Sequence, residues 1–164
     1  MAKKSIMQYP LPFFKKRNAS PLLNDVPENK YKNKKIIIDG IEFSSKIESL
    51  AYLYFKDLLN KGLINNLSLQ PKYLLQEGFY KKYYDGKKNK IIAAKHRDIN
   101  YVADFEFYYK DKIFTIEIKG LEDQKYPIKK KLFLKKYINN HFIEIRNQKQ
   151  LYSILEILDA LVFK

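Results

Sequence analysis

The chain of 164 residues contains no cysteine. This absence excludes a disulfide scaffold, a zinc site built from thiolates and a cysteine nucleophile. Histidine is scarce too, and its two residues offer no zinc-ligand spacing. Glycine and proline together fill only eleven positions, which excludes collagen and low-complexity linkers. With 46% hydrophobic and 15% aromatic residues, the sequence predicts a globular protein with one domain and a tail.

Long hydrophobic runs are also missing. The runs that occur are short, such as Ile36 to Ile38, whereas a membrane-spanning helix needs about 20 residues. The sequence therefore predicts no membrane partner and no signal-peptide core. Together with the lack of cysteine, it predicts a reducing, cytoplasmic location.

Acidic residues are few relative to basic ones, with 18 Asp and Glu against 32 Lys and Arg, for a net charge of +14. Residues 1–35, 81–97 and 125–136 hold 22 of the 32 basic residues. Such concentrated charge favours a polyphosphate partner, most often nucleic acid. The alternative is that the lysines form solvated faces and reflect an AT-rich genome.

The pattern along the chain predicts a basic, partly ordered arm over 1–34 and a folded domain over 35–164. We expect a hairpin over 36–43 and either a hairpin or a loop over 77–99. Residues 101–109 and 113–119 are expected to form two paired strands. A further strand covers 67–76 and contains Pro71, and another covers 141–145. Helices are expected from Ser44 or Ser45 to Gly62, over 127–138 and over 151–162. The fold class is α/β, with a central mixed sheet flanked by helices.

Acidic residues and a lysine occupy the two paired strands. If their turn centres between Lys110 and Asp111, Asp104 lies opposite Glu117, and Val102 lies opposite Lys119. Two carboxylates opposite each other repel, and a divalent cation would relieve the conflict. The sequence therefore predicts a Mg²⁺ site at Asp104 and Glu117, with the carbonyl of Ile118 beside it and Lys119 as a charge near the scissile phosphate. The alternative is an ordinary water-facing side of an antiparallel sheet.

Four blocks resemble the PD-(D/E)XK nuclease superfamily, in particular a family of small phage endonucleases and the end-cleaving subunit of some heteromeric bacterial transposases. The blocks are residues 38–48, 69–71, 101–105 and 116–120, followed by a lysine-rich helix. The resemblance implies a restriction-endonuclease-like core, with the element order αβββαβ. It implies cleavage of DNA in phage or mobile-element processing with Mg²⁺, for which Mn²⁺ would substitute. It also implies a bacterial host cell, with a phage as one source of the gene. Superfamily members often form homodimers, although no heptad here marks an interface.

The resemblance also assigns roles to residues. Asp104 and Glu117 would bind metal, Glu48 would add a third carboxylate, and Lys119 would be the catalytic lysine. Residue 103 is alanine where the motif has proline, a departure common in this superfamily. Taken alone, Glu48 is explained by the helix dipole, which favours an acid in the first turn.

Other residues are expected to bind nucleic acid. The Gln70 side chain either points into a cleft that holds the predicted Mg²⁺ site or satisfies backbone groups. Tyr80, Tyr83 and Tyr84 either stack on bases or pack within the protein. Phosphate contacts are expected from Lys81, Lys82, Lys87, Lys88, His96, Arg97, Lys129, Lys130, Lys131, Lys135 and Lys136. A non-catalytic nucleic-acid-binding protein is the rival function; it predicts acids dispersed in solvent, with Glu48 far from them.

Overall fold

The computed structural model describes residues 35–120 and 124–163. The predicted basic arm, residues 1–34, lies outside the described residues. The chain divides into two compact units that meet in sequence between Lys46 and Ile47.

The first unit contains the predicted hairpin. Strands β1 (Ile36–Ile38) and β2 (Ile41–Phe43) pair antiparallel. Asp39 and Gly40 between them both have positive φ angles, 53° and 76°. Two successive residues of this kind form the tight turn that matches the twist of a hairpin. The Asp-Gly pair thus predicted the turn correctly.

The second unit begins with helix α2, which runs over Lys46–Asn60 and starts at the junction. One side of the helix is buried, including Leu50, Phe55 and Leu58. Gly62, with a φ of 66°, follows the last turn. The left-handed conformation suits glycine and ends the helix where the sequence predicted.

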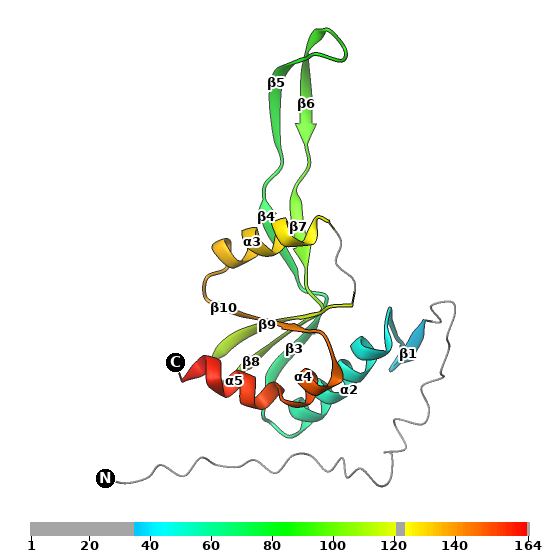
Figure 1. Ribbon diagram of the computed structural model, residues 1–164, viewed down its shortest axis with the longest axis vertical. Helices are drawn as coiled ribbons and strands as arrows, with labels where there is room; N and C mark the ends of the chain where they lie inside the picture. Colours follow the sequence, from blue (N-terminus) through cyan, green and yellow to red (C-terminus); the bar gives the residue numbers. More distant parts are fainter. Residues whose placement is uncertain (1–34, 121–123, 164) are drawn as a thin grey trace. The chain divides into compact units, whose positions relative to one another are not determined.

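A mixed four-stranded sheet forms the centre of this unit, in the order β10-β9-β8-β3 (Figure 1). Strand β10 is parallel to β9, whereas β8 is antiparallel to both β9 and β3. The predicted mixed sheet is therefore confirmed. The strands are β3 (Asn65–Leu69), β8 (Phe105–Tyr109), β9 (Lys112–Ile118) and β10 (Asn140–Ile145).

The turn between β8 and β9 centres on Lys110 and Asp111, whose φ angles are 47° and 59°. Phe105 consequently pairs with Ile116, and Tyr109 with Lys112. This is the predicted register, and it continues towards Asp104 opposite Glu117. A shift of one residue would have exchanged the two faces of the strand.

Two of the predicted strands are each broken in two. The 67–76 segment forms β3 and then β4 (Lys72–Gln76), and the 101–109 segment forms β7 (Ile99–Val102) and then β8. Strands β4 and β7 pair with each other in a separate two-stranded sheet. Val102 therefore pairs with Lys72, and its predicted place opposite Lys119 is wrong.

The two breaks face each other. Gln70 has a left-handed φ of 49° and precedes Pro71, which has no N–H to donate. The Gln70 N–H donates to the carbonyl of Asp104 at 2.9 Å, and the Ala103 N–H donates to the carbonyl of Pro71 at 3.1 Å. The β3–β4 segment and the β7–β8 segment both leave the central sheet at this point, which we call the strand crossing. The alternation of apolar and polar residues along each segment did not reveal it.

Strands β5 (Phe79–Asp85) and β6 (Lys90–His96) form a hairpin, one of the two alternatives expected for 77–99. Figure 1 shows it extending beyond β4 and β7, away from the central sheet. Most of its side chains are exposed on both faces. It forms a two-stranded sheet of its own.

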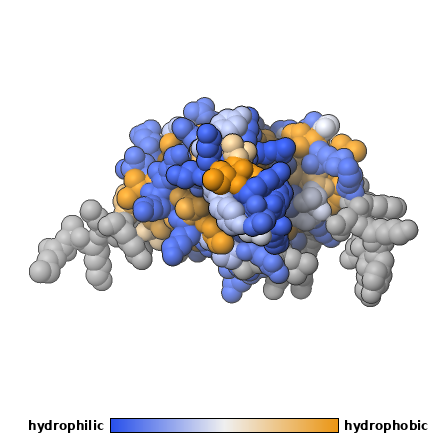
Figure 2. All heavy atoms as spheres, turned by 90° about the horizontal axis from the view of Figure 1, so that it is seen from above, coloured by the Kyte–Doolittle hydropathy of each residue, from blue (hydrophilic) through white to orange (hydrophobic). Residues whose placement is uncertain are grey.

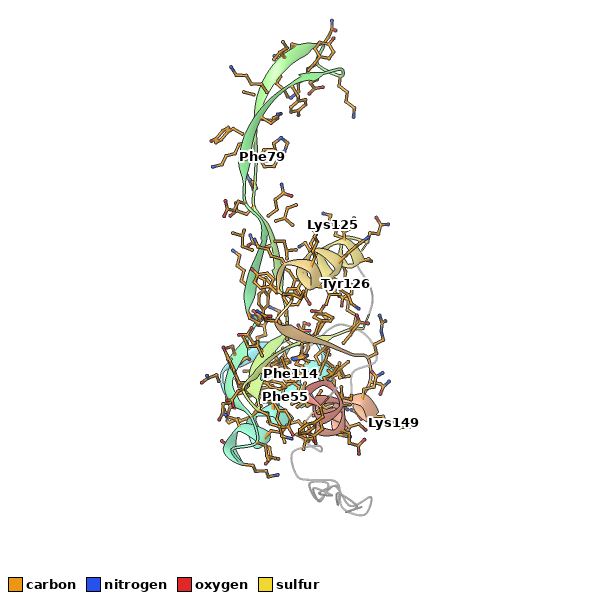
Figure 3. All side chains as sticks on the ribbon, turned by 90° about the vertical axis from the view of Figure 1, so that its left-hand side faces the viewer. Phe55, Phe79, Phe114, Lys125, Tyr126 and Lys149 are labelled. Atoms are coloured by element: carbon orange, nitrogen blue, oxygen red, sulfur yellow. The ribbon has the colours of Figure 1, made fainter. Side chains whose placement is uncertain are left out.

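Helices cover both sides of the central sheet. Helix α3 (Tyr126–Lys136) lies on one side, and α2 and α5 (Ile154–Val162) lie on the other (Figures 1 and 3). The Phe55 ring packs on Phe105 and Phe107, at 5.2 and 5.1 Å between centroids. The predicted single helix over 151–162 is instead α4 (Gln148–Tyr152) and α5, separated at Ser153.

A second cluster of buried side chains lies between α3 and the β4–β7 pair. It contains Tyr73, Leu75, Tyr101, Ala103, Tyr126 and Phe133. Among the described residues, no helix is long and apolar enough to cross a membrane.

Candidate acidic site

Of the two predicted carboxylates, Glu117 lies on β9 and Asp104 lies in the short break between β7 and β8. The Asp104 N–H donates to the carbonyl of Ile116 at 3.1 Å, which holds the residue against β9 just before β8 begins. Its side-chain Oδ2 accepts the Ile118 N–H at 2.6 Å. Asp104 therefore lies beside Glu117 on β9. Ile118, predicted to ligate metal through its carbonyl, contacts Asp104 through its N–H, and the carbonyl role stays a prediction.

The site is on a buried face of the sheet. Glu117 is 7% exposed, and Thr115, two residues earlier on the same face, is completely buried. In Figure 3, Tyr126 lies on this α3 side of the sheet, and Phe55 and Phe114 lie on the other. The alternative of a water-facing side is wrong for Glu117, which is buried and bonded to Tyr101 on β7.

Both carboxylate oxygens of Glu117 are held by hydrogen bonds. The Tyr101 hydroxyl donates to Oε2 at 2.6 Å, and the Lys119 ammonium donates to Oε1 at 2.9 Å. The Lys119 side chain is only 12% exposed. Its Nζ also lies 3.6 Å from the centroid of the Tyr126 ring, within the range of a cation–π contact. Lys119 is thus fixed between an acid and an aromatic ring.

Asp104 has the most perturbed carboxyl of the site. Its pKa is raised to about 7, and burial is the largest cause. The negative charges of Glu117 and Glu48 also raise this pKa, whereas the hydrogen bond from Ile118 and the positive charge of Lys119 act to lower it. Glu48 from α2 is therefore close enough to act on Asp104 electrostatically. The three acids and the lysine predicted from the sequence are brought into one neighbourhood, in which acids outnumber the base.

The donor set suits a hard cation. Asp104 and Glu117 offer carboxylate oxygens, the ligands that Mg²⁺ prefers, and one or two carboxylates with water and phosphate oxygens commonly complete its shell. Excess negative charge at a buried site also favours a cation. Within residues 35–120 and 124–163, no three His, Cys, Asp or Glu side chains come together as a metal-binding group. Ligation by Glu48 therefore stays a prediction.

Glu144 was missed by the sequence analysis. It pairs with Glu117 across β9 and β10. Its carboxylate accepts hydrogen bonds from Tyr126 and Lys130, both at 2.7 Å, and contacts Arg146. Burial acts to raise the pKa of Glu144, but these three partners outweigh it and lower the pKa to about 2.

The tyrosines of this layer were also missed. Tyr73 donates to Glu106, Tyr101 to Glu117 and Tyr126 to Glu144. Each hydroxyl reaches a different strand of the sheet, β8, β9 and β10. The alternation of acids along these strands is visible in the sequence, but nothing local indicates which tyrosine meets which acid. Glu106, which pairs with Thr115, thus lies on the same face as Glu117, with Tyr73 rather than Asp104 as its partner.

Gln70 meets the site through its backbone. Its N–H holds the carbonyl of Asp104, as described above, which matches the alternative that this residue satisfies backbone groups. The Gln70 side chain stays without an assigned role. Its position at the strand crossing explains why it lies close to the acids.

The predicted nucleic-acid-binding residues occupy two elements. Lys81, Lys82, Lys87 and Lys88 are exposed on the β5–β6 hairpin, and Arg97 is exposed just after it. Lys129, Lys130 and Lys131 all lie on α3, and Lys130 is paired with Glu144. The remaining candidates divide in the same way: Tyr80, Tyr83, Tyr84 and His96 belong to the hairpin, and Lys135 and Lys136 to α3. Figure 2, seen from the hairpin end, shows hydrophobic atoms surrounded by hydrophilic ones.

Fold and site define a mixed α/β protein with a covered acidic site on its central sheet. The chain belongs to the family described as protein of unknown function (DUF1064), whose model matches residues 28–151. That range includes Glu48, Asp104, Glu117 and Lys119. No curated protein and no solved structure matches the chain.

Proposed function

We propose that this protein is a Mg²⁺-dependent DNA endonuclease of the PD-(D/E)XK type. One observation carries the proposal: Asp104, just before β8, lies beside Glu117 on β9, with Lys119 bound to Glu117 and the negative charge of Glu48 acting on Asp104. This is the residue set that the resemblance assigns to metal binding and catalysis. DNA processing in a phage or mobile element, on a branched or otherwise structured substrate, is the role the resemblance implies.

Each residue of the site has a distinct task. Asp104 and Glu117 would hold Mg²⁺, which when bound activates water and stabilises the leaving oxygen. Lys119 places a fixed positive charge where the phosphate acquires negative charge in the transition state. Tyr101 orients Glu117, and the Tyr126 ring limits the movement of Lys119. Burial strengthens these electrostatic contacts because little water screens them.

The test is cleavage of linear, nicked, flap and four-way-junction DNAs with Mg²⁺, Mn²⁺ or EDTA. We expect metal-dependent cleavage by the wild type and a loss of at least about 100-fold in Glu117→Gln and in Lys119→Ala. Glu106→Gln is the matched control, since Glu106 lies on the same face with Tyr73 as its partner, and it should retain activity. Calorimetric titration with Mn²⁺ should lose its heat signal in Glu117→Gln only.

The second candidate is the non-catalytic nucleic-acid-binding protein, which the exposed basic hairpin favours. Its expectation that the acids are dispersed in solvent does not hold for Glu117, which is buried. It predicts DNA binding without cleavage of any substrate. That result, with no Mn²⁺ heat signal in the wild type, would overturn the nuclease proposal. Homodimer formation stays a prediction.

A further inference from the structure

The β5–β6 hairpin exposes both of its faces. Its strands stay in register from Phe79 opposite His96 to Asp85 opposite Lys90, and among the described residues neither strand pairs with a third. Tyr80 is 73% exposed and Ile91 is 74% exposed. A two-stranded sheet with both faces in water contributes little to a core, so its length needs another explanation.

The hairpin is strongly basic. Between residues 79 and 96 there are six lysines and a single acid, Asp85. That acid serves the turn: its Oδ1 accepts the N–H groups of Lys87 and Lys88, at 3.0 and 3.2 Å. The lysines lie on both faces and at the tip: Lys81, Lys82, Lys87, Lys88, Lys90 and Lys95. A partner that matches them must offer negative charge on more than one side.

The base of the hairpin is closed tightly. The Gly78 N–H donates to Asp98 at 2.7 Å, and a Cβ at Gly78 would lie 2.7 Å from the carbonyl of His96. Only glycine permits this close approach of the two chains. The contact braces the hairpin where it leaves β4 and β7.

The aromatic rings of the hairpin are engaged across the strands. Phe79 stacks on His96 with 4.6 Å between centroids, and Lys95 Nζ lies 5.8 Å from the Tyr80 ring. The Tyr84 hydroxyl donates to Asn89 in the tip. Such cross-strand pairs preform the ribbon. A preformed ribbon fits a partner with a rigid groove, whereas Tyr80 and Tyr84, 73% and 60% exposed, leave base stacking as the competing outcome that the test below separates.

We propose that the β5–β6 hairpin binds duplex DNA by lying in a groove, where its lysines contact the phosphates of both strands. The major groove of B-DNA, about 12 Å wide, admits a two-stranded ribbon. The choice of DNA as the polyanion rests on the proposed function. The inference adds a substrate class to it: DNA with a duplex segment beside the cleavage site.

The test measures binding of the full chain to a short labelled duplex by fluorescence anisotropy, in EDTA and over a series of salt concentrations. The variant K82Q/K87Q/K95Q removes three charges from the hairpin. The matched control, K61Q/K112Q/K149Q, removes three exposed charges from elsewhere in the second unit. We expect the slope of log affinity against log salt to fall by about two to three in the hairpin variant and by less than about one in the control.

Equal slopes in the two variants would overturn the inference. A preference for single-stranded DNA that disappears in Tyr80→Ala would overturn it in favour of base stacking. Binding to vesicles with anionic headgroups that needs the hairpin lysines, with duplex binding unchanged in the same variant, would overturn it in favour of a membrane surface.

Because binding is measured in EDTA, this inference and the proposed function fail separately. Hairpin-dependent duplex binding without metal-dependent cleavage would remove the nuclease and leave the inference standing. Metal-dependent cleavage with no contribution of the hairpin lysines to the salt slope would support the nuclease and overturn the hairpin inference.

Discussion

The acidic site and the β5–β6 hairpin use the same residue types in opposite ways. In the site, Tyr101 is 3% exposed and its hydroxyl is bound to Glu117. In the hairpin, Tyr80 is 73% exposed and its ring contacts a lysine of the facing strand. The lysines differ likewise, since the Lys119 side chain is 12% exposed and that of Lys88 is 60% exposed.

This contrast has an electrostatic consequence. A charge in the covered site acts over short distances with little screening, so it can fix one carboxylate or polarise one phosphate. Charges on the exposed hairpin are screened by salt within about 8 to 10 Å and act together as a field. One region is suited to chemistry at a single atom, and the other to holding a long polyanion.

The largest effect expected from this contrast is on stability. Phe133 is fully buried behind the site, with ring contacts to Tyr73 at 4.8 Å and Tyr137 at 5.2 Å. Phe133→Ala should lower the free energy of unfolding by about 3 to 5 kcal/mol, because it leaves a cavity. Tyr80→Ala should change it by less than about 0.5 kcal/mol, because that ring is exposed. Guanidinium unfolding of both variants measures the difference, and equal losses would contradict the contrast.

A smaller effect concerns pH. The unfolded Asp104 carboxyl ionises near 3.8, whereas its folded pKa is about 7 because of burial and neighbouring acids. Between these values the folded protein holds the extra proton, so the free energy of unfolding should fall as pH rises, by at most about 1.4 kcal/mol per pH unit. Asp104→Asn should remove this decline.

Thermal unfolding in EDTA from pH 4 to pH 8 tests the pH prediction. The exposed Asp57, which pairs with Lys61, supplies the control, and Asp57→Asn should retain the wild-type profile. A decline that persists in Asp104→Asn would assign it to another group.

The smallest effect concerns single hydroxyl groups. Tyr101→Phe removes the donor to a buried carboxylate and should cost about 1.5 to 3 kcal/mol, the range for a hydrogen bond to a charged group. Tyr84→Phe removes an exposed bond to Asn89 and should be close to neutral. Thermal unfolding compares the two variants. If Tyr101→Phe proves as harmless as Tyr84→Phe, the covered site does not hold Glu117 as described.

The sequence by itself determined the local elements. Asp39-Gly40 specified one tight turn, the apolar spacing specified α2, and the alternation along 101–119 specified the pairing of β8 with β9. These features depend on neighbours a few residues apart, so their periodicity is written directly in the chain. The same logic predicted the basic hairpin and put Asp104 and Glu117 side by side.

Only the tertiary structure decided the crossing at Gln70 and Ala103, the burial of Glu117 and the partners of Glu144. Each depends on segments tens of residues apart: Tyr101 reaches Glu117 only because β7 leaves the central sheet to pair with β4. Local periodicity carries no information about such long-range contacts, because the pattern of apolar and polar residues in a strand does not show whether water or another layer covers its polar face. The physical reason is that the burial of a side chain depends on how distant segments pack together. Here that burial makes acids of an ordinary strand pattern into a candidate site.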